Sequence, residues 1–394
     1  MIAVIADDLT GAAELGGIGL RFNLKVEINA AVNLNSKADL LVISTDTRSK
    51  PRVEAVEQMA KVTEELLQLN PTLIFKKVDS VLRGHVVAEI EAQLRVLQLK
   101  RALLVPANPA LGRVLTKGEY LINGQPIHQT SFSHDPEFAI TTSSVLGILG
   151  GSELPIQVQH HQEPMASTGI LVGEATSTAD LQAWASHSDS HTFAAGASGF
   201  FTALLHKLLP QANGFQTTTQ DPFEEPALYV CGTTFSKSRD AIQQINENGG
   251  PVCYMPAAIA LATHPEEVAY QQWTSEILSC LSTTGKAVIA IAAETTAGAS
   301  VSADDLRKKT ARVVQLVTLQ YHNLKELVLE GGSTAFAVLQ ALQLQEFYPI
   351  REVSPGVIRM RVAAKPGLCL TLKPGSYAWS TDIWNFDTQQ TQVP

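Results

Sequence analysis

The sequence is poor in cysteine and in charge, and each shortage excludes a class of protein. It has 4 cysteines among 394 residues, and no two of them stand at the Cys-x-x-Cys spacing of a zinc site. We therefore expect buried, reduced thiols in a cytoplasmic protein and no cysteine-bound metal. Charged residues make up only 17%, while the hydrophobic fraction of 45% supports a sizeable core instead of general disorder.

Long apolar runs and an excess of basic residues are also missing. No stretch reaches the roughly 18 apolar residues that cross a bilayer, so we expect no membrane partner. The beginning, MIAVIADD, has two acids and no basic residue, which favours a core strand over a signal peptide. The net charge of −9 argues against nucleic acid as a partner, and an anionic substrate would need a local cationic pocket.

The first half of the chain repeats one pattern, in which a short apolar run is followed by a polar cluster and a helical stretch. The apolar runs occupy residues 2–6, 40–43, 73–75 and 102–105. Such runs are typical of strands that are buried on both faces of a parallel sheet. Helical spacing over residues 53–69 and 86–97 completes right-handed βαβ units. Because the carboxyl ends of parallel strands share one edge, we expect the polar clusters to meet there.

The length of the chain suggests two domains. Residues 211–226 are polar and lack periodicity, which predicts a linker. We therefore predict an α/β fold of two lobes, residues 1–210 and 227–394. Each lobe would have a largely parallel sheet flanked by helices, with a ligand cleft between the lobes. Residues 115–165 are rich in Gly, Ser, Thr and His, and we expect loops and irregular strands there.

Three strand ends in the second lobe are candidate phosphate loops. EGGSTAFAVLQAL places two glycines and two hydroxyls at a helix start, where free N–H groups suit a phosphate: Gly331, Gly332, Ser333 and Thr334. A tight turn is the alternative. CGTTFSKSR, with Ser236, and LKPGS, with Gly375, are weaker candidates, since such residues also start helices and make turns. The sequence has no G-x-x-x-x-G-K-S/T motif, which excludes a P-loop enzyme.

Two adjacent acids, Asp7 and Asp8, end the first strand of the first lobe. Neighbouring carboxylates repel one another, and burial raises the pKa of at least one of them. Such a group suits proton abstraction from a hydroxyl. The alternative is that Asp8 simply caps the following helix together with Thr10.

Cations follow the later strands of this lobe. KKVDSVLRG brings Lys76, Lys77, Asp79 and Arg83 together, so that Arg83 could hold a carboxylate and a lysine could offset phosphate charge. A solvated charge run is the alternative. TDTR adds a second acid–base pair: Asp46 and Arg48.

Adjacent histidines, His160 and His161, raise the question of a metal site. No carboxylate or histidine stands at helical spacing to complete a ligand set. We therefore expect a solvated pair in a loop, and no metal site is predicted.

IADDLTGA, TDTR, KKVDSVLRG and VPANPALGR together resemble the N-terminal lobe of the four-carbon acid sugar kinases, which include threonate, erythronate and 3-oxo-tetronate kinases. CGTTFS, EGGSTA and LTLKPGS are similar to that family's three ATP loops and occur in the same order. The resemblance spans about residues 2–377. It departs from the family pattern at His85, where the family usually has Asn, in the first ATP loop, where GTTFS is one residue longer, and in the last loop.

The resemblance implies ATP-dependent phosphorylation of the terminal hydroxyl of a four-carbon sugar acid. The sugar-acid side would comprise Asp7, Asp8, Asp46, Arg48, Lys76, Asp79 and Arg83. The ATP side would comprise Ser236, Gly331, Gly332, Ser333, Thr334 and Gly375. We favour Asp8 as the base and expect Mg²⁺ to bridge the ATP phosphates. The protein could form a homo-oligomer.

Two other functions stay open. ADDLTGA loosely resembles the DxDxT nucleophile loop of phosphohydrolases, although here the two acids are adjacent. A non-catalytic relative that binds a sugar acid is the second alternative, because the ATP loops depart from the family pattern.

Overall fold

The structure, a computed structural model, describes all residues except 136, 211–221, 233–235, 293–300, 376 and 387–394. The chain divides into two compact units, residues 1–216 and 217–394. Most of the predicted linker lies outside the described residues, so its conformation and the predicted lobe boundaries stay predictions.

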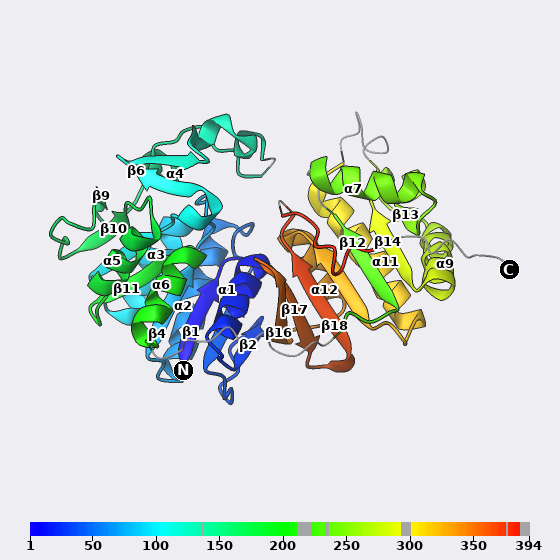
Figure 1. The fold of residues 1–394 in the computed structure, drawn as a ribbon, viewed down its shortest axis with the longest axis horizontal. Helices are drawn as coiled ribbons and strands as arrows, with labels where there is room; N and C mark the ends of the chain where they lie inside the picture. The colour runs from blue at the N-terminus through cyan, green and yellow to red at the C-terminus, as the bar shows by residue number, and fades with distance from the viewer. Residues whose placement is uncertain (136, 211–221, 233–235, 293–300, 376, 387–394) are drawn as a thin grey trace. The chain divides into compact units, whose positions relative to one another are not determined.

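Strands and helices alternate through most of the first unit (Figure 1). Its strands are β1 (Ile2–Ala6), β2 (Val26–Asn29), β3 (Leu40–Ser44), β4 (Leu73–Lys77), β5 (Arg101–Val105), β6 (Arg113–Thr116), β7 (Glu119–Ile122), β8 (Gln125–Pro126), β9 (Ile156–Gln159), β10 (Gly169–Gly173) and β11 (Thr192–Gly196). Its α-helices are α1 (Leu9–Arg21), α2 (Arg52–Leu67), α3 (Val86–Leu97), α4 (Val145–Leu149), α5 (Thr178–His187) and α6 (Ser198–Leu208). Its 3₁₀ helices are η1 (Pro109–Leu111), η2 (Ile127–Gln129) and η3 (Ser131–His134).

The main sheet of the first unit is parallel, with the strand order β2-β3-β1-β4-β11-β5-β10-β9. Every residue of β1 and β3 is buried, which explains why these segments are continuously apolar. In register, Ala6 lies beside Ser44 on one side and beside Lys77 on the other. The polar residues that follow β1, β3 and β4 therefore leave the sheet side by side.

Helices cover both faces of this sheet. On one face α2 and α3 pack together over a core that includes Ile5, Ile43, Met59 and Ala92. On the other face α1 and α5 each pack against α6. Residues that alternate along a strand point to opposite faces, so each strand serves both layers.

The segment expected to be irregular contains more order than the sequence indicated. Strands β6, β7 and β8 form a small antiparallel sheet of their own, drawn in cyan in Figure 1. Strand β9 extends the main sheet by pairing in parallel with β10. These strands are short and only partly buried, so they lack the continuous apolar runs by which the other strands were recognised.

The second unit repeats the alternation and ends in three antiparallel strands (Figure 1). Its strands are β12 (Ala227–Cys231), β13 (Val252–Tyr254), β14 (Lys286–Ala290), β15 (Glu326–Glu330), β16 (Glu346–Ser354), β17 (Val357–Val362) and β18 (Lys365–Lys373). Its helices are α7 (Ser236–Glu247), α8 (Ala257–Ala260), α9 (Glu267–Thr284), α11 (Ala303–Gln320) and α12 (Gly332–Ala341). The strand order is β13-β14-β12-β15-β18-β17-β16, and it is parallel from β13 to β18 and antiparallel beyond.

The predicted fold class is confirmed, because each unit is an α/β unit with a largely parallel sheet and flanking helices. The predicted ligand cleft between the lobes stays a prediction. None of the helices in the described part of the chain combines the length and the apolar character that crossing a membrane requires.

Candidate functional site

Two strands of the first unit end in acids and a third leads into an arginine, and the structure brings these side chains together. Asp7 and Asp8 follow β1, Arg48 follows β3, and Asp79 and Arg83 follow β4. Because β1 lies between β3 and β4, these residues share the carboxyl edge of the sheet. Three of the four polar clusters that we expected to meet therefore lie together at this edge.

Arg48 lies at the centre of this group. We call the group the Arg48 cluster and include the neighbouring Asp46, so that it comprises Asp7, Asp8, Asp46, Arg48, Asp79 and Arg83. Its Nε and Nη2 atoms donate to the two carboxylate oxygens of Asp7 at 2.9 and 3.1 Å, and its Nη1 donates to Asp8 Oδ2 at 3.0 Å. Its Nη2 also lies 3.8 Å from Asp79 Oδ1. A guanidinium has five N–H groups, so two of them remain for a ligand. The side chain is only 14% exposed, which strengthens each of these interactions.

Asp8 has a structural role that the sequence left open. Its side chain caps α1, with Oδ1 accepting from the Gly11 N–H at 2.8 Å and Oδ2 from the Thr10 hydroxyl at 2.6 Å. Burial opposes ionisation of Asp8, but the cations Arg48 and Lys77 and these hydrogen bonds outweigh burial and lower its pKa. Asp8 is therefore a firmly held carboxylate.

Asp79 and Arg83 form a second ion pair with two hydrogen bonds, like that of Asp7 and Arg48. The Arg83 Nε and Nη2 atoms donate to the two oxygens of Asp79 at 2.8 and 2.9 Å, and Nη1 donates to Asp135 at 2.8 Å. Burial opposes ionisation of Asp79, but Arg83 and Arg48 outweigh it and hold its pKa well below the usual value. The Arg83 guanidinium also lies 5.6 Å from the centre of the Phe132 ring.

Asp46 differs from the other acids of the group. Burial and the neighbouring Asp8 carboxylate raise its pKa to about 7, and the cations Lys50 and Arg48 only partly offset them. Its φ of 50° lies in the left-handed region, which residues other than glycine seldom adopt. Such strain is concentrated at functional sites, where it holds a side chain in place. Asp46 thus has a pKa near neutrality, whereas the pKa values of Asp8 and Asp79 are lowered.

The two lysines of β4 point to different environments. Lys76 is fully buried, with its ammonium 2.7 Å from Glu89 Oε2 in α3, and it does not join the Arg48 cluster. Lys77 lies on the other face, 3.5 Å from Glu14 in α1, and it lowers the pKa of Asp8. The sequence-based choice of Lys76 as a sugar-acid ligand therefore has no support from this geometry, and Lys77 is the better placed of the two.

Arg113, at the start of β6, and two residues of the irregular segment border the cluster and were absent from the predicted site. The hydroxyl of Tyr120 donates to the Ser80 carbonyl and Arg113 donates to the Ser80 hydroxyl. The Phe132 ring lies under the guanidiniums of both Arg83 and Arg113. Arg113 could have been found, because it ends the polar cluster after β5, whereas no pattern marked Tyr120 or Phe132.

In the second unit the three candidate phosphate loops leave neighbouring strands. They follow β12, β15 and β18, which are adjacent in the sheet. Gly331 has a φ of 87°, and it precedes the first residue of α12, Gly332. Among the described residues, the side chain nearest to a Cβ added at Gly331 would be Thr334, whose Oγ1 would lie 3.9 Å away, so these residues leave the backbone there open to an approaching anion. A Cβ added at Gly232 would come within 2.2 Å of Thr334 Oγ1, so the first two loops pack closely.

A buried ion pair joins the ends of β15 and β18, from which two of these loops leave. Lys373 and Glu330 are both fully buried, with Nζ and Oε1 2.5 Å apart, and the Ser238 hydroxyl donates to the same oxygen. Gly375 lies in the turn after β18, while the side chain of Ser236, at the start of α7, is outside the described residues. Both residues stay predicted ATP ligands, as do Gly331, Gly332, Ser333 and Thr334.

Comparisons with known proteins divide the chain in the same way. A family model described as a sugar-binding N-terminal domain matches residues 2–204, and one described as a nucleotide-binding C-terminal domain matches residues 228–377. A D-threonate kinase of Salmonella typhimurium is 27% identical over 384 residues, which cover 89% of each chain. A 3-oxo-tetronate kinase of Brucella melitensis is 24% identical over 423 residues, which cover 99% of this chain and 95% of that protein.

Solved structures share the fold at lower sequence identity. A Salmonella typhimurium LT2 protein superposes with a TM-score of 0.79 at 19% identity, covering 97% of each chain. A Haemophilus influenzae protein superposes with a TM-score of 0.72 at 18% identity, covering 97% of this chain and 98% of that one.

Proposed function

Since this chain belongs to the four-carbon acid sugar kinase family, and is thus a kinase that acts on a sugar acid, we propose that it transfers the γ-phosphoryl group of ATP to the terminal hydroxyl of a four-carbon sugar acid. Threonate, erythronate and 3-oxo-tetronate are the candidate substrates. The observation that carries the proposal is the Arg48 cluster, which lies in the part of the chain that matches the sugar-binding domain.

The cluster suits a ligand that carries both hydroxyls and a carboxylate. Carboxylate oxygens accept hydrogen bonds from sugar hydroxyls, and Asp7, Asp46 and Asp79 supply such oxygens within one group. The cations supply the complement, because Arg48 and Arg83 each use three of five N–H groups on protein acceptors. The remaining N–H groups can hold the carboxylate of the substrate.

Two acids compete for the role of the base. Asp8 was favoured from the sequence, but its oxygens already accept from Thr10, Gly11 and Arg48, and its pKa is lowered. We propose Asp46 instead, because a base works best when its pKa lies near the operating pH. The Asp8 carboxylate would then orient the substrate and keep the pKa of Asp46 high by repulsion.

ATP would bind at the loops of the second unit. The N–H groups of the first turn of α12 and the open backbone at Gly331 suit the phosphates. The described residues of the three loops offer no exposed carboxylate, since Glu330 is buried and paired with Lys373. We therefore expect Mg²⁺ to be held through the phosphates and water, where it would neutralise their charge.

The chemistry needs little more than positioning. The base takes the proton of the terminal hydroxyl as its oxygen attacks the γ-phosphorus, and the bond from that phosphorus to the bridging oxygen of ATP breaks. The products are the phosphorylated sugar acid and ADP. The bound cations and the fixed acids hold the acceptor in line, which is the main source of rate in phosphoryl transfer.

The test is a coupled assay of ADP release with threonate, erythronate and 3-oxo-tetronate. We expect release with at least one of them, and we expect Asp46→Asn to lower kcat by two to four powers of ten. For the wild type, kcat/KM should rise with pH through about 7. If Asp8→Asn loses most of its turnover while Asp46→Asn keeps normal turnover, Asp8 is the base.

The same assay separates the other functions. Thermal stabilisation by a sugar acid without ADP release would indicate a non-catalytic binding protein. Phosphate release from a phosphorylated sugar acid without ATP would indicate a phosphohydrolase. The engaged state of Asp8, with hydrogen bonds to both oxygens, argues against its use as the nucleophile of such an enzyme.

A further inference from the structure

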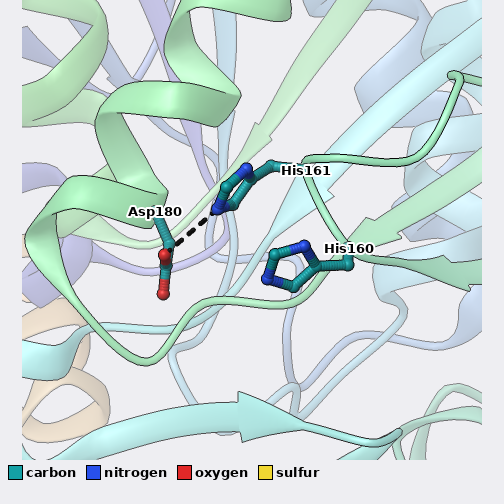
Figure 2. A group of neighbouring side chains, drawn as sticks. All are labelled: His160, His161 and Asp180. Carbon is teal, nitrogen blue, oxygen red and sulfur yellow. Dashed lines mark hydrogen bonds and ion pairs between the residues drawn. The ribbon is translucent and has the colours of Figure 1, made fainter.

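The two adjacent histidines of the first unit lie beside a carboxylate that the sequence did not reveal. His160 and His161 follow β9, and Asp180 lies in the first turn of α5 (Figure 2). One ligand atom from each of the three lies within 4.8 Å of the others. The pair that we expected to be solvated in a loop therefore has a carboxylate beside it, because Asp180 completes a group of three possible ligands from a distance of 19 residues along the chain.

The spacing suits a small divalent cation. His161 Nε2 lies 3.2 Å from Asp180 Oδ1. Two ligands held tetrahedrally at about 2.0–2.1 Å from one ion are about 3.3 Å apart, so this pair needs almost no movement. The rings of the two histidines lie 4.2 Å apart at 36°, and Figure 2 shows a nitrogen of each turned to the side of the carboxylate.

Neighbouring groups fix two of the three ligands. Oδ2 of Asp180 accepts hydrogen bonds from Thr176 and Ser177 as part of the capping box of α5, which leaves Oδ1 facing His161. The ring of His161 also contacts the edge of Trp184, which is fully buried. Hydrogen bonds and packing that orient ligands in this way are typical of metal sites.

His160 can become the third ligand at little cost in free energy. Its Nδ1 accepts only a long hydrogen bond of 3.4 Å from the Gln162 main chain. The side chains of His161 and Asp180 are 18% and 17% exposed, so the group is sheltered and still reachable from solvent.

We propose that His160, His161 and Asp180 bind one Zn²⁺ ion, with water in the remaining position. Two imidazoles and a carboxylate form a ligand set that Zn²⁺ favours, whereas Mg²⁺ and Ca²⁺ prefer oxygen ligands alone. This site is separate from the Arg48 cluster, because β4, β11, β5 and β10 lie between β1 and β9 in the sheet. It does not depend on the proposed kinase substrate.

The position of the site indicates a structural role. Among the described strands of the first unit's sheet, β9 is the last in the order and pairs only with β10. An ion bound here would join the end of β9 to the start of α5. Ligand binding to the folded state alone stabilises it by mass action, so Zn²⁺ should raise the melting temperature.

The test uses the full chain after treatment with EDTA and desalting. We expect titration calorimetry with ZnCl₂ to show one site, and Co²⁺ to give the visible absorption of a tetrahedral ion. The variant H160A/H161Q should bind Zn²⁺ at least ten-fold more weakly and should lose the rise in melting temperature. The exposed histidine His191 provides the matched control, H191A, which should bind like the wild type.

The single variant His160→Ala keeps the test decisive if the double variant does not fold, because it removes a long hydrogen bond to Gln162 and the ring contact with His161 but leaves Asp180 and its capping bonds in place. The proposal is overturned if the wild type takes up no Zn²⁺. It is overturned equally if either folded variant binds Zn²⁺ as tightly as the wild type does.

Discussion

The guanidinium of Arg48 holds both oxygens of Asp7, at 2.9 and 3.1 Å, although 41 residues separate the two along the chain. This fork joins the end of β1 to the segment after β3, and the same side chain reaches Asp8 and Asp79. A planar fork of donors can make these contacts at once, whereas an ammonium cannot.

We therefore expect Arg48→Lys to lower kcat/KM for the sugar acid about 100-fold or more, since the acids that position the substrate would lose their common partner. The free energy of unfolding should fall by about 2 kcal/mol, because charged hydrogen bonds are lost while the acids stay buried. The measurements are ADP release and urea unfolding. Arg52→Lys, at an exposed position at the start of α2, is the control. Equal behaviour of the two variants would contradict a central role for Arg48.

Asp46 should make the folded protein less stable as the pH rises toward neutrality. Its pKa is raised from 3.8 to about 7 in the folded protein, so between these values the folded state binds more protons than the unfolded state. The contribution of Asp46 to the free energy of unfolding therefore falls as the pH rises from about 4 to about 7, and then stays low. Asp46→Asn removes this penalty.

We expect Asp46→Asn to be more stable than the wild type by roughly 2–4 kcal/mol at pH 8, with a much smaller difference at pH 4. Urea unfolding at both values measures it, with Glu57→Gln at an exposed position of α2 as the control. A difference that does not change with pH would show that Asp46 titrates normally.

Lys76 and Glu89 are predicted to contribute to folding and not to catalysis. Lys76→Met should lower the free energy of unfolding by about 3–5 kcal/mol, because it leaves the buried Glu89 carboxylate without its cation. The double variant K76M/E89L removes both charges and should recover most of the loss. Urea unfolding of the two variants gives the comparison. If the double variant is no more stable than K76M, the pair is not coupled.

Gly331 allows a prediction specific to ATP. Gly331→Ala should raise the KM for ATP about ten-fold or more and leave the KM for the sugar acid unchanged, because the added methyl faces the proposed phosphate site. The control is Gly249→Ala, at a φ of 73° with nothing within 4 Å of the added Cβ. Both variants should lose about 1–3 kcal/mol of stability from backbone strain. An equal KM for ATP in both would argue against the phosphate site.

The sequence was sufficient for the parts of the site that depend on strand order. Once Asp7, Arg48 and Asp79 are placed after successive strands of a parallel sheet, topology alone brings them together. It was not sufficient for features that depend on a single residue of register. Lys76 and Lys77 look alike in the sequence, and only the pairing of β4 decides which of them faces α1.

Other features could not be predicted from the sequence, because no local motif marks them. Asp180, in the first turn of α5, meets His161, two residues after β9, only in the folded chain, and a spacing of 19 residues matches no recognisable motif. No local motif marks the left-handed backbone of Asp46, and the place of the Phe132 ring under two arginines depends on contacts between segments far apart in the sequence. The role of Asp8 as a helix cap was considered from the sequence and is present in the structure.

The alternation of Lys76 and Lys77 limits how this protein can change in evolution or by design. Deleting or inserting one residue in the short turn before β4 could slide the strand by one position and exchange the two ammonium groups between its faces. Depending on the direction of the slide, either Glu89 would lose its buried cation or Asp8 would lose the lysine beside it, although Asp8 would keep Arg48. Length variation among functional descendants should therefore be rare at this turn.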